Sequence, residues 1–189
     1  MFSRDFACIV KPSENHQPFL FIKTQHMKKI IALAGLVCSC LLATAQLKTT
    51  PVCPPFTIDI LDGRIGDLDP KSTQGQIKKA FPCFTSAEAE SDSAKCGGTV
   101  FYKDKDIYFY TKRDYVEIGP AFKGKLSIPL LGASRTGLFK WLGNPKIKDV
   151  SWDAYQTSYG ILILYFNKAN KINRIRFSTQ SVETINLCE

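Results

Sequence analysis

YGILILYFNKANKINRIRF, residues Tyr159–Phe177, is the stretch that decides the fold. Ile161–Phe166 is an unbroken run of aliphatic and aromatic residues, and after a polar turn Ile172–Phe177 alternates apolar and polar side chains, a pattern typical of a β-hairpin. Because the first strand is apolar on both faces, we expect it to lie inside a sheet. A helix should cover one face of this strand. Aromatic neighbours, a loop or a partner should cover its other face. The two tryptophans, Trp141 and Trp152, are expected to pack against it in the core.

A short helix is expected before this hairpin. Ser134 is its candidate N-cap, Leu138–Leu142 carries apolar residues at helical spacing, and Gly143–Pro145 ends it. Ala154–Thr157 then begins a strand. The second half of the chain is therefore predicted to be a helix followed by an antiparallel meander.

The same order is predicted in the first half of the chain. A helix begins at Asp69–Pro70 or at Ser72, where a carboxylate or hydroxyl can accept the first free N–H groups, and Pro82 ends it. Three strands are predicted after this helix, at Thr99–Tyr102, Ile107–Tyr110 and Tyr115–Ile118. Shorter strands are predicted at Phe56–Leu61 and Val182–Leu187.

The two halves also match each other residue by residue. Ser72, Gly75, Ile77 and Lys78 of the first helix correspond to Ser134, Gly137, Phe139 and Lys140 of the second at a constant offset of 62 residues. One duplication of this length favours a single domain of two units over a solenoid. We therefore predict an α+β fold in which two helix-then-antiparallel-meander units, at about residues 60–120 and 121–180, form one disulfide-stapled sheet with both helices on one face.

This layout resembles the tandem α/β repeat fold of the β-lactamase-inhibitor-protein family and of small outer-membrane assembly lipoproteins. The likeness is carried by the Ser134-capped helix ending in Leu142–Pro145, by Trp152 and Tyr155, and by the hairpin Tyr159–Phe177. It covers Leu130–Phe177. The first half matches loosely, because a loop between Cys83 and Cys96 is inserted where the family runs directly into a strand. The resemblance implies protein binding across a curved sheet without catalysis, and it assigns no site residue.

Met27–Gln46, MKKIIALAGLVCSCLLATAQ, has the pattern of an export signal. Two lysines precede a 13-residue apolar run, too short for the ~20 residues that span a bilayer, and small residues supply the cleavage pattern. We expect residues 27–45 to be a signal peptide. Residues 1–26 are then either a misassigned upstream segment or an unusually long charged region that is removed with it. Lipid attachment at Cys40 is disfavoured because the apolar run continues past it. Residues 46–189 are then expected to be a single mature domain in the periplasm or the medium.

Three of the seven cysteines precede the mature chain, at Cys8, Cys38 and Cys40. The four that remain favour two disulfides in an exported protein. Of the three possible pairings, we expect Cys83 with Cys96, which closes a short polar loop, and Cys53 with Cys188, which joins the first mature residues to the last. A metal site is disfavoured because the mature chain has no CxxC spacing and no histidine to complete a ligand set.

Both histidines, His16 and His26, also precede the mature chain. Their loss excludes Ser–His and Cys–His nucleophilic pairs and histidine metal sites, so we expect no enzyme and no cofactor. The mature part keeps 20 Lys and Arg against 15 Asp and Glu, a net charge of +5, and its cations are scattered. Scattered charge of this size is typical of a solvated surface and does not predict nucleic-acid binding.

Four carboxylates lie within eleven residues, at Asp59, Asp62, Asp67 and Asp69. A pair of them could serve as general acid and base, so a small-ligand protein or a hydrolase is an alternative function. Asp62–Gly63 and Asp69–Pro70 are also turn and helix-start signals, and the spacing does not match a calcium-binding loop. These aspartates are therefore expected to have either structural roles in turns or the catalytic role of the alternative function.

One face of the sheet is predicted to carry tyrosine and arginine. Side chains alternate along a strand, so the apolar residues at 107, 109, 175 and 177 face the helices and their neighbours face away. These neighbours are Tyr108, Tyr110, Arg174 and Arg176, with Tyr115 beside them. Tyr and Arg are enriched at protein-binding hot spots, although exposed antiparallel faces also carry them because they suit strands and water. We therefore expect a noncatalytic binding or inhibitor-like module for a protein or envelope partner, with no nucleic acid and no transmembrane span. A structural envelope component is a further alternative.

Overall fold

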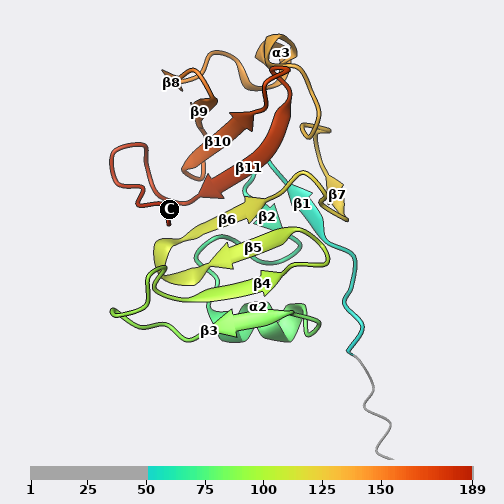
Figure 1. Cartoon of the computed structure of the whole chain (residues 1–189), viewed down its shortest axis with the longest axis vertical. Coiled ribbons are helices and arrows are strands. Elements are labelled where there is room, and N and C mark those ends of the chain that lie inside the picture. Colours follow the sequence, from blue (N-terminus) through green and yellow to red (C-terminus); the bar gives the residue numbers. More distant parts are fainter. Residues whose placement is uncertain (1–50, 189) are drawn as a thin grey trace, which may run out of the picture. The chain divides into compact units, whose positions relative to one another are not determined.

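The computed structural model describes residues 51–188, whose arrangement is shown in Figure 1. The expected signal peptide, the segment before it, and Cys8, Cys38 and Cys40 lie outside the described residues. The described part is mainly β-sheet with two short helices and two disulfides, an α+β composition. None of its helices has both the length and the apolar character needed to cross a membrane.

Eight strands form one antiparallel sheet in the order β3-β4-β5-β6-β11-β10-β9-β8 (Figure 1). Their bounds are β3 Ser86–Glu88, β4 Thr99–Tyr102, β5 Ile107–Tyr110, β6 Tyr115–Ile118, β8 Ile147–Lys148, β9 Trp152–Gln156, β10 Ile161–Phe166 and β11 Ile172–Ser178. The predicted bounds of β4, β5, β6 and β10 are confirmed to the residue. β10 lies between β11 and β9, so the prediction that the apolar strand is inside the sheet is also confirmed.

The first helix, α2 (Gln74–Ala80), begins later than the sequence predicts. The Thr73 hydroxyl accepts a hydrogen bond from the Gln76 N–H at 3.3 Å, and Gln76 Oε1 accepts one from the Thr73 N–H at 2.8 Å. This capping box makes Thr73 the N-cap. Ser72 instead accepts from the Asp69 N–H within the preceding turn, so the predicted start at Asp69–Pro70 or Ser72 is corrected.

The second helix, α3 (Phe139–Leu142), is only four residues long. A 3₁₀ turn, η2 (Arg135–Gly137), precedes it where the sequence predicts continuous α-helix, and Gly137 at the junction has little preference for helix. Leu138 is buried, whereas Trp141 is 37% exposed. The expectation that Trp141 packs in the core is therefore wrong.

Three short strands form a second sheet in the order β2-β1-β7, namely Arg64–Ile65, Thr57–Asp59 and Lys125–Leu126. β1 lies within the predicted strand Phe56–Leu61, but it does not join the main sheet. The 3₁₀ turn η1 (Thr111–Arg113) connects β5 to β6. The predicted strand Val182–Leu187 is wrong, because the N–H groups of Thr184 and Ile185 both donate to the Ser181 carbonyl in a tight turn.

Both helices contribute to the main core. Ile77 of α2 and Leu138 beside α3 belong to the same cluster of buried side chains, which also holds the inward residues of the main sheet. Successive partners across the sheet form this inward row: Val100, Phe109, Val116, Phe177, Leu162 and Tyr155. The main core therefore lies on one face of the sheet.

The disulfides join Cys53 to Cys83 and Cys96 to Cys188, each with a Cα–Cα distance of 5.4 Å. The predicted pairs Cys83–Cys96 and Cys53–Cys188 are therefore wrong. The segment between Cys83 and Cys96 is not a simple loop, because it contains the edge strand β3, which pairs with β4 and carries the chain away from Cys83. Cys83 stays beside the N-terminal segment, where its N–H donates to Cys53 Sγ at 3.2 Å.

Candidate functional site

Cross-strand register gathers the predicted tyrosines and arginines on the face of the main sheet opposite the core, called here the helix-free face. One row of partners is Phe101, Tyr108, Glu117, Arg176 and Ile163, and the next is Tyr110, Tyr115, Ser178 and Ile161. Arg174 is the partner of Tyr165, two residues along the same face. The structure therefore brings together the five residues predicted for partner binding, Tyr108, Tyr110, Tyr115, Arg174 and Arg176.

Four rings on this face, Phe101, Tyr108, Tyr110 and Tyr115, form an aromatic ladder. The Phe101 ring lies edge-on to Tyr108 and Tyr110, at centroid distances of 5.3 and 5.5 Å, and Tyr110 stacks on Tyr115 at 4.3 Å. Tyr115 is fully buried, whereas the other three are half-buried. Phe101 was missed in the sequence, although the same alternation along Thr99–Tyr102 points it to this face.

The Tyr108 end of the ladder is fixed by a carboxylate. The Tyr108 hydroxyl donates to Asp106 Oδ1 at 3.0 Å, and the other Asp106 oxygen accepts from the Ala121 N–H at 2.7 Å. Burial, followed by the hydrogen bond and the charge of Asp106, raises the pKa of Tyr108 to about 12. The phenol therefore stays protonated at neutral pH, as a polar group held in one position.

Arg176 on β11 links Glu117 on β6 to Tyr165 on β10. Its Nε donates to Glu117 Oε2 at 2.6 Å and its Nη1 donates to the Tyr165 hydroxyl at 3.0 Å. Its guanidinium also lies over the rings of Tyr115 and Tyr165, 5.8 and 5.0 Å from their centroids. Burial works against the charged form, but the hydrogen bond and charge of Glu117 outweigh it and raise the pKa of Arg176. Arg176 is only 6% exposed, so its guanidinium holds Glu117 and Tyr165 in place and is not itself available to a partner.

Arg174 presents the exposed charge of the same cluster. Its Nε lies 3.8 Å from Glu117 Oε1, and its guanidinium lies 5.5 Å from the Tyr165 ring centroid. Arg174, Arg176 and Glu117 are called here the arginine cluster. The cluster contains two cations and one carboxylate. Because Glu117 is bound more closely by Arg176 than by Arg174, the unbalanced positive charge lies at Arg174.

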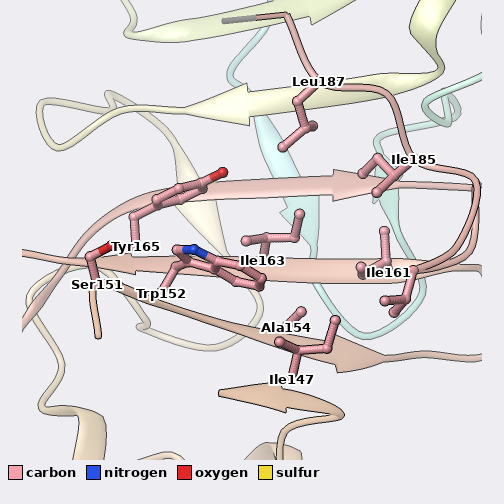
Figure 2. A pocket seen from close by; sticks show the side chains of 10 residues that line it. Ile147, Ser151, Trp152, Ala154, Ile161, Ile163, Tyr165, Ile185 and Leu187 are labelled. Atoms are coloured by element: carbon pink, nitrogen blue, oxygen red, sulfur yellow. The ribbon is translucent and has the colours of Figure 1, made fainter. Parts of the chain in front are cut away.

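A groove of about 500 Å³ lies on the helix-free face over β9 and β10 (Figure 2). It is lined by Ile147, Ser151, Trp152, Ala154, Ile161, Ile163, Tyr165, Val182, Ile185 and Leu187. In Figure 2, Ser151, Trp152 and Tyr165 lie together at one end, whereas Ile161 and Ile185 lie at the other. The groove is therefore polar at one end and apolar along the rest of its length.

The segment 179–188, called here the C-terminal strap, forms one wall of this groove. Its end is held by the Cys96–Cys188 disulfide, and the Cys188 N–H donates to the Tyr115 hydroxyl at 3.1 Å. Arg113 Nη1 donates to Asn186 Oδ1 at 2.7 Å and to the Leu187 carbonyl at 3.2 Å. The sequence predicts that aromatic neighbours, a loop or a partner cover the second face of β10. In the structure the C-terminal strap covers it.

Two of the four aspartates of the alternative function hold turns with their carboxylates. Asp59 Oδ1 accepts from the N–H of Leu61 at 3.0 Å, and Asp69 Oδ1 accepts from the N–H of Lys71 at 2.9 Å. The other two, Asp62 and Asp67, are exposed. Within residues 51–188, no group of three or more His, Cys, Asp or Glu side chains is placed to hold a metal ion.

Comparison of the chain with protein-family models, with curated proteins and with solved structures finds no significant match.

Proposed function

We propose that this protein is an exported, noncatalytic module that binds a protein or envelope partner through the aromatic ladder and the arginine cluster of the helix-free face. The observation that carries the proposal is the contiguity of half-buried Phe101, Tyr108 and Tyr110 with exposed Arg174. Aromatic and arginine side chains dominate the binding energy of many interfaces. Because the Phe101 ring already packs edge-on against Tyr108 and Tyr110, a partner would lose little side-chain entropy in ordering these rings.

The disulfides support export. Cys53–Cys83 and Cys96–Cys188 belong in an oxidising compartment, and the sequence Met27–Gln46 has the pattern of the signal that would direct the chain there. The hydrolase alternative has less support, because Asp59 and Asp69 serve their own turns.

The strand order supports a duplicated origin, which we propose together with the resemblance to the β-lactamase-inhibitor-protein family. β3 to β6 follow one another in chain order across the sheet, and β8 to β11 follow in reverse, so β6 and β11 are neighbours. The first set follows α2 and the second follows α3. In this proposal each helix and the four strands after it form one unit.

Site-specific crosslinking tests the proposed binding face. A photoreactive phenylalanine analogue is placed at Tyr108 and, in a matched variant, at Phe139, a 67% exposed aromatic residue on α3. We expect envelope extract to give a discrete adduct with the Tyr108 variant that excess unmodified protein suppresses. An adduct from Phe139 with none from Tyr108 would assign binding to the helix-bearing side and refute the proposal.

A double substitution then tests the contribution of the face. In the variant that carries the photoreactive analogue at Tyr108, Phe101→Ala with Arg174→Ala removes a half-buried ring and an exposed charge from the face and should abolish the adduct, whereas Arg176 is unsuitable because it is buried and ion-paired. Unchanged capture by a folded double variant would contradict the proposal.

A further inference from the structure

The groove over β9 and β10 has the dimensions of a small-molecule site. Its volume of about 500 Å³ lies within the roughly 300–1,000 Å³ typical of ligand pockets. Such pockets are mostly apolar with a few polar groups that orient the ligand. The side chains of Ala154, Ile161 and Ile163 supply the apolar floor, and Ser151 and Tyr165 supply hydroxyls.

The walls of the groove are fixed before anything binds. The floor belongs to two strands inside the sheet, with Ile161 and Ile163 at most 4% exposed. The opposite wall is the C-terminal strap, which is tied by Cys188 to Cys96 and by Asn186 to Arg113. A site of this kind needs little reorganisation, because the residues that anchor the strap lie outside the groove.

The shape of the groove selects a slender ligand. Figure 2 shows Leu187 and Ile185 of the strap on one side, and Ala154 and Ile147 of the sheet on the other. From Tyr165 to Ile161 the floor extends along β10 for about 13 Å, at the usual rise per residue of a strand. An elongated apolar ligand can follow this length between the two walls.

The charge at the polar end selects the head group. Arg174 lies beside the Tyr165 ring at 5.5 Å, and the arginine cluster holds two cations for one carboxylate. Glu117 is bound by Arg176 at 2.6 Å and approaches Arg174 only to 3.8 Å. An added anion at Arg174 would complete the neutralisation of the cluster.

We propose that the groove binds a single-chain carboxylate amphiphile of fatty-acid type, with its alkyl chain between Trp152 of the sheet and Ile185 and Leu187 of the strap and its carboxylate at Arg174. This site does not depend on the proposed protein partner, because the ladder residues do not line the groove. Arg174 lies just outside the lining, beside Tyr165, and would meet the carboxylate where the polar end of the groove opens. The two proposals share only Arg174.

Tryptophan fluorescence locates the ligand directly. The chain has two tryptophans, Trp152 in the groove and Trp141 on α3. In a Trp141→Phe variant, a dodecanoate brominated on its alkyl chain should quench Trp152 in a saturable manner, below the concentration at which the probe forms micelles. In the matched Trp152→Phe variant, Trp141 should show no saturable quenching. Absence of saturable quenching of Trp152, or equal quenching of both, would overturn the proposal.

Two substitutions test the ends of the groove, with dodecanoate binding to the purified protein measured by calorimetry. Ile185→Trp fills the apolar end and should abolish binding, and Val182→Phe fills it from a second position if the first variant does not fold. Arg174→Gln should weaken dodecanoate about two- to five-fold, as expected for a partly exposed ion pair, and leave dodecanol unchanged. Lys168→Gln removes a cation from the exposed β10–β11 turn and is the control. Dodecanoate affinity that survives both groove-filling variants, or falls equally in Arg174→Gln and Lys168→Gln, would refute this site.

Discussion

Arg174 and Arg176 carry the same charge two residues apart on β11, but they have different surroundings. Arg176 is 6% exposed and gives its Nε to Glu117 at 2.6 Å, whereas the Arg174 side chain is 46% exposed and lies 3.8 Å from the same carboxylate. A partly buried carboxylate that loses its close partner keeps its desolvation cost. Burial therefore decides which arginine stabilises the fold and which is available for binding.

This difference predicts unequal effects on stability. Arg176→Ala should lower the free energy of unfolding by about 3–5 kcal/mol, because it leaves Glu117 without its close cation inside the sheet face. Arg174→Ala should change it by about 1 kcal/mol or less, as for other exposed pairs. Urea denaturation followed by circular dichroism measures both, and equal losses would contradict the assigned roles.

The Tyr108–Asp106 hydrogen bond predicts a change in stability at alkaline pH. Burial and Asp106 raise the pKa of Tyr108 to about 12 in the folded protein, from an ordinary value of 10.0. The stabilising contribution is complete below pH 10, where the phenol is protonated in both states, and is lost as pH rises towards 12, because the unfolded chain releases its proton first. Burial raises the pKa of Tyr155 to about 12 as well, so the phenolate absorbance that appears near pH 12 should fall by the contribution of one tyrosine in Tyr108→Phe, and Asp106→Asn should move the Tyr108 contribution to lower pH. An absorbance change near pH 12 that is the same in the unmodified protein and in Tyr108→Phe would contradict this contact.

At the scale of elements, the C-terminal strap covers the apolar strand β10. Its residues Val182, Ile185 and Leu187 pack on Ala154, Ile161 and Ile163. The Cys96–Cys188 disulfide spans 92 residues and holds the strap, whereas Cys53–Cys83 spans 30 and ties α2 to the N-terminal segment. The two bonds therefore have separable consequences.

Removing each disulfide separately should show this. Loss of Cys96–Cys188 by double serine substitution should cost about 4–5 kcal/mol and loss of Cys53–Cys83 about 3–4 kcal/mol, in the chain-entropy model. Only the first should free the strap, expose Ile161 and Ile163, and increase binding of an apolar fluorescent dye. Denaturation and dye titration of the two variants measure the effects, and equal dye binding would indicate that the strap stays in place without its bond.

The success of sequence analysis also varied by element. Strands β4, β5, β6 and β10 were predicted to the residue, because their apolar runs are bounded by clear turn residues. The edge strand β3, with the sequence SAE, has no such pattern, and missing it led to the wrong disulfide pairing. The start of α2 was misplaced because Thr73 and Ser72 are both good N-caps, and only the reciprocal bond with Gln76 distinguishes them.

Prediction of the candidate site was limited by contacts between distant segments. Alternation gathered the tyrosines and arginines on one face, but it could not show that Tyr115 and Arg176 are buried there. Their burial depends on Cys188 and Tyr165, which come from the strap and from β10. The groove could not be predicted from the sequence either, because the strap that forms its wall has no regular pattern of apolar and polar residues.

At the scale of the whole described domain, the two sets of four strands meet at β6 and β11. Val116 is the cross-strand partner of Phe177, both fully buried in the core, and Glu117 is bound to Arg176 on the other face. The Cys96–Cys188 bond also crosses between the two sets. Because both faces are joined along this pair of strands, neither set can lose its partner without exposing the core.

This connection predicts a single cooperative unfolding transition. Trp152 lies on β9 in the second set, so its fluorescence in Trp141→Phe reports that set, whereas far-ultraviolet circular dichroism reports the entire sheet. In urea the two signals should change together, since all-or-none unfolding makes different probes coincide. Phe177→Ala should cost about 3–5 kcal/mol by leaving a cavity between the sets, and should shift both signals by the same amount. Separated transitions, or a Phe177→Ala shift seen only by Trp152, would show that the two sets unfold independently.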